Sequence, residues 1–205
     1  MGFRDALKPN KNQIIKTKQV KFIDQIRQSI GSYFFRRDLA KVHRNRCIMN
    51  LNDAKIIGLI YNASDEVTYD IISNFVKYFQ ENQKIVKALG YVNYNRLPYY
   101  CFPKLSYDYF TKRDLNWYFK PTNLRVTDFI NEEFDIVIDL SMTDCFPLNY
   151  ISGLSKGKFK VGRYSDKYSS IYDFMLNIDN NISLEKYIQE TIRYLNIINR
   201  NAQQI

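Results

Sequence analysis

The chain has 205 residues, 45% hydrophobic and 25% charged, which suffices for one well-packed domain, and its 5 prolines and 7 glycines form no flexible linker. Three distant cysteines and a single histidine cannot supply a paired metal-ligand set, so we expect neither a metal nor a cofactor. The sequence shows neither a signal-peptide pattern nor an apolar run of about 18 residues, which predicts a cytoplasmic protein.

The net charge of +9 is concentrated at the N-terminus. Residues 1–46 contain 12 lysines and arginines against 3 aspartates, whereas residues 47–205 contain 18 basic and 18 acidic residues. The sequence therefore predicts a basic helical arm over residues 1–46 and a neutral domain over residues 47–205.

The arm has an amphipathic pattern, which predicts one or two helices between residues 12 and 46, broken near Gly31. Its apolar positions are Val20, Ile23, Ile26, Ile30 and Phe34. Three interpretations stay open. The apolar stripe packs on the domain, the basic face binds phosphates of RNA or a ribosomal particle, or the helix lies on an anionic membrane, which its lack of tryptophan disfavours. The candidate phosphate-binding residues are Lys16, Lys18, Lys21, Arg27, Arg36, Arg37, Lys41, Arg44 and Arg46.

The domain opens with a strand, a helix and a second strand. Residues 55–61 form a compact apolar run, typical of a strand buried on both faces. Residues 66–83 carry apolar side chains at helical spacing after a cap at Ser64 or Asp65, and residues 84–92 give the next strand. This succession predicts a parallel βαβ unit with a right-handed crossover.

The least regular part of the domain follows and includes a candidate short strand at residues 105–110. After it, cations and aromatic residues alternate around Lys112, Arg113 and Trp117. Exposed, this segment would stack on the bases of single-stranded RNA and contact its phosphates. Folded inward, Trp117 would simply belong to the core. Both interpretations stay open.

Strands and helices then alternate again. Residues 124–131 predict a short helix, and residues 134–140 predict another buried strand. Pro147 fits the first turn of a helix that ends near Ser155, and residues 158–162 give a fourth principal strand.

The C-terminal part completes the sheet. Residues 172–178 predict a strand at one side, and residues 183–200 predict a closing amphipathic helix capped by Ser183. The whole pattern predicts an α/β fold with a three-layer, mostly parallel, Rossmann-like sheet of five or six strands.

Parallel sheets bind ligands beyond the carboxyl ends of their strands, where this chain would also place Asn93 and residues 163–166. The loops expected there are polar but offer neither a histidine base nor a glycine-rich phosphate loop, which argues against a dinucleotide site of the usual kind. The candidate ligand-binding residues are Asn62, Ser64, Asp65, Ser141, Thr143 and Asp144.

Three aspartates are the catalytic candidates. Asp139 lies in an apolar strand and must find a partner, for which backbone N–H groups are the simpler explanation. Asp65 and Asp144 would form an acid/base or Mg²⁺ pair if they were adjacent, although helix capping explains both. Cys145 has no base nearby, because His43 lies in the arm, so we do not expect a nucleophile there.

Six segments resemble an uncharacterised family of small bacterial proteins known only as a domain of unknown function. They are IGLIYNASDE (57–66), KALGYVNYNRLPYYCFPKL (87–105), FTKRDLNWYFKP (110–121), FDIVIDLS (134–141), CFPLNYI (145–151) and KFKVGRY (158–164). This resemblance implies no activity and no catalytic residues. Locally, residues 134–164 are similar to a strand-helix-strand unit in the N-terminal half of heptosyltransferase-type glycosyltransferases, whose nucleotide-sugar domain has no counterpart here.

Together these patterns predict a non-enzymatic cytoplasmic module that docks on RNA or a ribosomal particle through its arm. Residues Lys112, Arg113 and Trp117 would provide a second contact. The alternative is a sugar- or nucleotide-handling, transferase-like enzyme with a pocket at the carboxyl ends of the strands, formed by Asn62, Asp65, Ser141 and Asp144.

Overall fold

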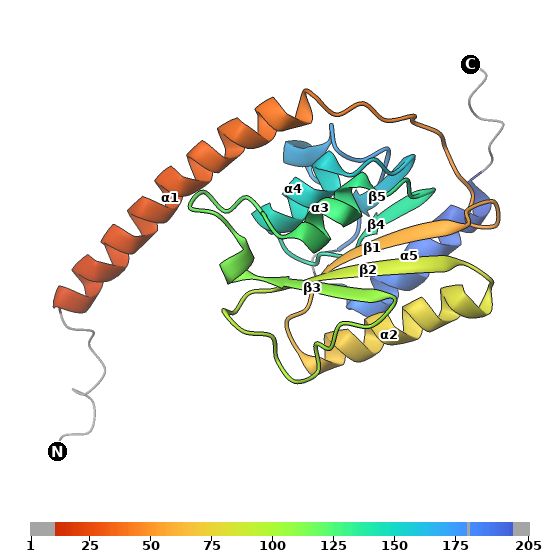
Figure 1. The fold of residues 1–205 in the computed structure, drawn as a ribbon, viewed down its shortest axis with the longest axis horizontal. Helices are drawn as coiled ribbons and strands as arrows, with labels where there is room; N and C mark the ends of the chain where they lie inside the picture. Colours follow the sequence, from red (N-terminus) through yellow and green to blue (C-terminus); the bar gives the residue numbers. More distant parts are fainter. Residues whose placement is uncertain (1–10, 180, 199–205) are drawn as a thin grey trace.

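A computed structural model describes residues 11–179 and 181–198, with side chains from residue 22 onward. Six parallel strands form one sheet in the order β3-β2-β1-β4-β5-β6 (Figure 1). This is the strand order of doubly wound Rossmann-like sheets. The strands are β1 (Ile56–Asn62), β2 (Ile85–Val92), β3 (Tyr107–Thr111), β4 (Ile136–Asp139), β5 (Phe159–Arg163) and β6 (Phe174–Leu176).

Two helices cover each face of the sheet (Figure 1). One face packs against α2 (Glu66–Glu81) and α5 (Leu184–Ile197), and the other against α3 (Leu124–Asn131) and α4 (Phe146–Leu154). A further helix, α1 (Lys11–Leu39), runs along the outside of α4. Two short 3-10 helices, η1 (Lys112–Asp114) and η2 (Asp166–Tyr168), follow β3 and β5.

The predicted three-layer α/β fold is confirmed, and the sheet is parallel throughout. Asp65, one of the two residues considered, caps α2, and Ser183 caps α5 as predicted. The strand predicted over residues 172–178 contracts to the three residues of β6, which forms one edge of the sheet. An edge strand pairs on one side only, so fewer of its residues are held in the ladder.

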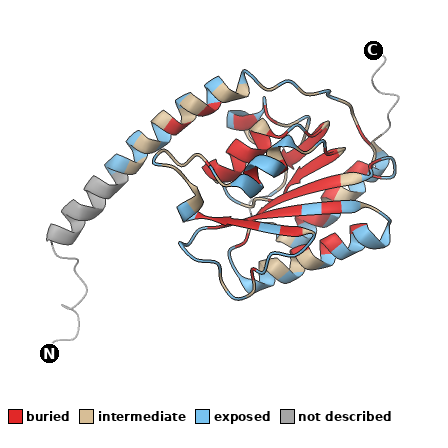
Figure 2. Cartoon of the chain, in the orientation of Figure 1, coloured by how far each residue is buried: buried red, intermediate tan, exposed pale blue. Residues whose placement is uncertain are grey.

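The alternation of side chains along the strands divides the core into two parts. On β1, Leu59 and Tyr61 pack toward α2 and α5, whereas Ile60 packs toward α3 and α4. Buried residues are concentrated in the strands and in α4 (Figure 2). In β5 the same alternation places Lys160, between two apolar neighbours, on the α4 side with only 1% of its surface exposed.

The N-terminal helix α1 is continuous, so the predicted break near Gly31 is wrong. The glycine instead permits a close approach. A Cβ at this position would lie 2.4 Å from the carbonyl oxygen of Tyr118 and 3.1 Å from the ring of Phe146. One turn later, the buried Phe35 packs on the rings of Phe146 and Tyr150, with centroids 6.2 and 5.2 Å away.

The packing of α1 involves only part of the predicted apolar stripe. Phe34 stacks on Tyr118 with ring centroids 4.7 Å apart, whereas Ile23 and Ile26 remain 52% and 42% exposed. The side chain of Val20 lies outside the described residues. The C-terminal half of α1 therefore docks on the domain. Across the described parts of the chain, no helix has both the length and the apolarity needed to cross a membrane.

Candidate functional site

A cleft of about 1040 Å³ lies at the carboxyl ends of β1, β2 and β4. Because the connections from β1 and β4 leave in opposite directions, this is the switch point at which doubly wound sheets bind ligands. The predicted Asn62, Ser64, Asn93, Thr143 and Asp144 all line it. The strand order therefore brings together residues from three separate loops.

The ends of β1 and β4 are in direct polar contact. The Asn62 amide donates to the Thr143 hydroxyl at 3.4 Å. Asp65 instead caps the start of α2, because its carboxylate accepts hydrogen bonds from the Thr68 N–H at 2.7 Å and from the Ser64 hydroxyl at 3.1 Å. The Thr68 N–H is the main cause that lowers the pKa of Asp65. Asp65 thus has the capping role that was the simpler of its two explanations.

Asp144 belongs to a different network. Its carboxylate accepts hydrogen bonds from the Asn149 amide at 2.7 Å, the Tyr168 hydroxyl at 3.1 Å and the Lys167 ammonium at 3.1 Å. It does not cap α4, whose N-cap residue is Cys145, so this part of the prediction is wrong. Asp144 instead ties α4 to η2, and its half-exposed carboxylate forms part of the cleft wall.

Asp139 is buried, with 3% of its surface exposed, and fully engaged. It accepts the hydroxyls of Ser152 and Tyr172, each at 2.7 Å, and the Ser141 N–H at 2.9 Å. Burial, followed by the charge of Asp139, raises the pKa of Tyr172. Asp139 and Ser141 line a smaller adjoining pocket of about 380 Å³, together with Arg163. These three hydrogen bonds satisfy the buried carboxylate, so Asp139 has a structural role.

The thiol of Cys145 lines the cleft but is not activated. Burial raises its pKa to about 12, so the sulfur stays protonated near neutral pH. Within the described ranges, no three histidine, cysteine, aspartate or glutamate side chains gather as a metal ion would require. The polar groups of the cleft suit hydrogen bonding to a ligand better than nucleophilic attack.

A second candidate site forms where α1 meets the segment after β3. The Arg27 guanidinium donates to the Trp117 carbonyl oxygen at 2.6 Å. It also lies over the ring of Phe119, 4.1 Å from its centroid. With the stacking of Phe34 on Tyr118, these contacts bring two segments about 90 residues apart in the chain into one surface.

Asp38 anchors this junction. Its carboxylate accepts hydrogen bonds from the Lys120 ammonium at 2.8 Å, from the Arg37 guanidinium at 3.3 Å and from the Tyr150 hydroxyl. Burial alone would raise the pKa of Asp38, but the bonds from Lys120 and Tyr150 outweigh it and lower this pKa to about 2. One ionised carboxylate thus joins α1, α4 and the segment after β3.

Both of these segments carry exposed aromatic rings and exposed cations. Tyr33 and Trp117 have 65% and 57% of their surfaces exposed, so Trp117 is not a core residue. We use the name basic ridge for the exposed aromatic and basic residues of these two segments, which are Tyr33, Arg36, Arg37, Lys41, Lys112, Arg113 and Trp117.

Other predicted phosphate-binding residues have different positions. The Arg44 side chain is 5% exposed, and its guanidinium donates two hydrogen bonds of 2.7 Å to Asp173, so it serves a structural ion pair. Arg46 is 3.8 Å from the same carboxylate and 67% exposed. The side chains of Lys16, Lys18 and Lys21 lie outside the described residues.

Sequence reasoning missed one contribution of α1. Its residues Asp24, Arg27 and Gln28 form a wall of the carboxyl-end cleft. Nothing in the local pattern indicates this, because it depends on where α1 docks. The arm and the cleft, which were predicted as separate features, therefore share a boundary.

Comparison with known proteins places this fold in a family. No curated protein and no solved structure matches the chain. The local similarity to heptosyltransferase-type enzymes therefore stays a prediction. A family model described as a family of unknown function, DUF6913, matches residues 27–198, from within α1 to just after α5. This match covers most of the sequence, and the chain belongs to the DUF6913 family of unknown function.

Proposed function

We propose that the protein is a cytoplasmic, non-enzymatic module that docks on the RNA of a ribosomal particle through its basic ridge. One observation carries the proposal. The two segments predicted separately as RNA contacts, α1 and residues 112–120, are joined in one surface by the Arg27–Trp117 hydrogen bond and the Phe34–Tyr118 stack.

The chemistry of the basic ridge suits single-stranded RNA. Its five cations offer charge to phosphates, and its two exposed rings offer faces on which bases stack. Binding of single-stranded nucleic acid weakens with salt by a logarithmic slope of roughly −0.7 per neutralised phosphate, so five contacts give a slope of about −3.5.

Co-sedimentation with ribosomes tests this proposal. A variant with Arg36→Glu, Lys41→Glu and Lys112→Glu should lose co-sedimentation at low salt while keeping its circular dichroism spectrum. A matched control carries the same change in net charge on α2 and α5, which cover the other face of the sheet. Its substitutions are Lys77→Glu, Lys186→Glu and Arg193→Glu. Loss of binding in both variants would show only an effect of net charge, and unchanged binding in the ridge variant would refute the proposal.

The carboxyl-end cleft favours a second candidate function, which is a sugar- or nucleotide-handling, transferase-like activity. Its supporting observation is the contact of Asn62 with Thr143 at the switch point, beside a cavity large enough for a nucleotide. In a thermal-shift screen of nucleotides and nucleotide sugars, a true ligand should stabilise the wild type but not Thr143→Val. Equal stabilisation of both proteins would place the ligand elsewhere.

A further inference from the structure

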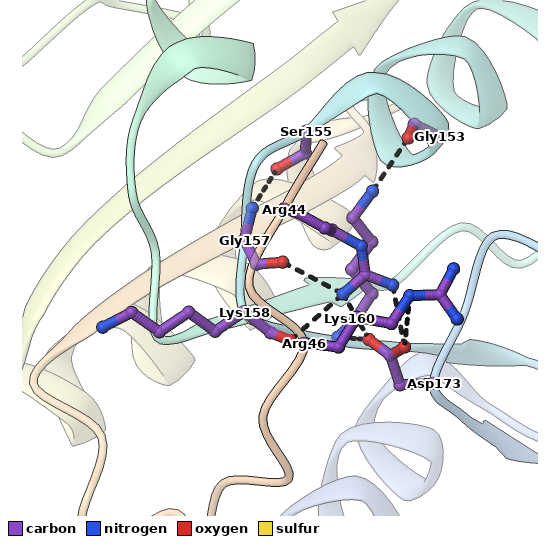
Figure 3. A network of polar contacts seen from close by, with 8 residues as sticks. All are labelled: Arg44, Arg46, Gly153, Ser155, Gly157, Lys158, Lys160 and Asp173. Carbon is purple, nitrogen blue, oxygen red and sulfur yellow. Dashed lines mark hydrogen bonds and ion pairs between the residues drawn. The ribbon is translucent and has the colours of Figure 1, made fainter. Parts of the chain in front are cut away.

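A second cavity, of about 700 Å³, lies beside the start of β5, at the end of the strands opposite to the carboxyl-end cleft. It is enclosed by the segment after α1, the end of α4 and the start of β5. Its lining includes five lysines and arginines, namely Lys156 and the four shown in Figure 3, Arg44, Arg46, Lys158 and Lys160. None of these cations is explained by the proposed RNA-binding surface or by the carboxyl-end cleft.

Lys160 is the central residue of this cavity. It is buried in β5, and its ammonium donates one hydrogen bond of 2.8 Å, to the Gly153 carbonyl oxygen in the last turn of α4 (Figure 3). An ammonium has three N–H donors. Among the described residues, the other two have no hydrogen-bond partner. Buried donors are normally satisfied, so these two N–H groups are available to an acceptor that enters the cavity.

The charges around Lys160 determine which kind of acceptor would suit the cavity. The Asp173 carboxylate is already paired with the guanidinium groups of Arg44 and Arg46, and it also accepts the backbone N–H of Lys160 (Figure 3). Asp135 is taken by Lys158 at 2.8 Å. With the exposed Glu133, which lines the cavity, three carboxylates therefore lie in or beside a lining that contains five cations. The cavity has an excess of positive charge, which an anion would compensate.

The rigidity of the lining supports a preformed site. Arg44 donates to the carbonyl oxygens of Gly157 and Lys158 at 3.2 and 3.1 Å as well as to Asp173, so its guanidinium is fixed against the turn before β5 (Figure 3). A fixed cation beside a buried ammonium avoids much of the ordering cost of anion binding.

We infer that this cavity binds a small phosphate-like oxyanion, held by the Lys160 ammonium and by the neighbouring Arg46 at the cavity mouth. The volume fits a phosphorylated small molecule. The site is distinct from the basic ridge and from the cleft, and it does not depend on the proposed RNA binding.

The titration of Lys160 gives the inference a specific signature. Burial, and then repulsion by Arg44, lower the pKa of its ammonium to about 7. Sulfate keeps its charge over the range used, so its affinity should fall by about tenfold between pH 6 and pH 8 as Lys160 loses its proton. The other charged or titratable groups that line the cavity are His43, Arg44, Arg46, Lys156, Lys158 and Glu133, and Asp135 and Asp173 are ion-paired with two of them. His43→Asn therefore serves as the control for a histidine effect.

The test is a titration of the full chain with sodium sulfate against sodium chloride of equal ionic strength, followed by the amide chemical shifts of residues 156–160. Saturable shifts are expected in the wild type and in His43→Asn. Lys160→Met and the exposed Arg46→Gln, which leaves the core untouched, should weaken binding by about tenfold or more, and Lys160→Met should also abolish the pH dependence.

Three results would overturn the inference. These are shifts that stay linear in the wild type, wild-type affinity in both Lys160→Met and Arg46→Gln, and a pH dependence that disappears in His43→Asn rather than in Lys160→Met. Binding of RNA can be lost or kept in any of these cases, because the basic ridge is a separate surface.

Discussion

Replacement of Gly31 by alanine should loosen α1 from the domain, although alanine is the better helix former. Alanine in a helix interior gains about 1 kcal/mol over glycine. The added Cβ would lie 2.4 Å from the Tyr118 carbonyl oxygen, a backbone atom that cannot rotate away. Overpacking of this kind costs about 1–3 kcal/mol, so the net effect is a loss of about 1 kcal/mol of docking free energy.

Hydrogen exchange of the α1 amides measures this loss directly. In Gly31→Ala, exchange over residues 28–39 should accelerate by about fivefold relative to the wild type. Ser29→Ala, on the exposed side of the same helix, is the matched control, and its exchange should stay equal or slow slightly. If Gly31→Ala protected the helix as much as Ser29→Ala does, the close packing of α1 against the segment after β3 would be refuted.

Three further predictions follow from ion pairs and from the exposed tryptophan. Arg44→Met removes the two short hydrogen bonds to the Asp173 carboxylate, which then keeps only the Lys160 N–H and the exposed Arg46, so urea denaturation should show a loss of about 2 kcal/mol, against less than about 1 kcal/mol for Arg46→Met; equal losses would contradict the structural role of Arg44. Because the pKa of Asp38 is lowered to about 2, its contribution is complete above its ordinary pKa of 3.8 and is lost as pH falls through 2. Asp38→Asn should therefore remove about 1 kcal/mol of acid-sensitive stability, after allowance for solvent screening, and an unchanged acid-denaturation profile would count against the anchor. Trp117→Ala should leave the melting temperature within about 2 °C of the wild type, because 57% of the surface of this residue is exposed, and a larger drop would mean that the ring is part of the core.

Much of the fold is predictable from the sequence because local periodicity encodes it. The apolar run of β1 and the capping residues Asp65 and Ser183 are local signals, and each identifies its element. Gly31 shows where such reasoning fails. A glycine in a helical pattern indicates a weak point, but here it admits the Tyr118 backbone, which only the folded chain brings near.

The candidate sites were only partly predictable for the same reason. The strand-end rule finds Asn62 and Thr143, because parallel strands end at one edge of the sheet. The rule cannot find Arg27 as a wall of the cleft, since that depends on how α1 docks. Lys160 was missed because a lysine between apolar residues in a strand indicates a solvent-facing position, whereas α4 covers it here.

The proposed RNA contact of the basic ridge is tested most directly by the fluorescence of Trp117, the single tryptophan of the chain. Oligouridylate should quench this fluorescence in a saturable manner, with an affinity that falls steeply with salt. The ridge variant Arg36→Glu, Lys41→Glu, Lys112→Glu keeps the tryptophan and should lose the response. Fluorescence that does not change in the wild type, or that changes equally in the variant, would contradict RNA binding at this surface.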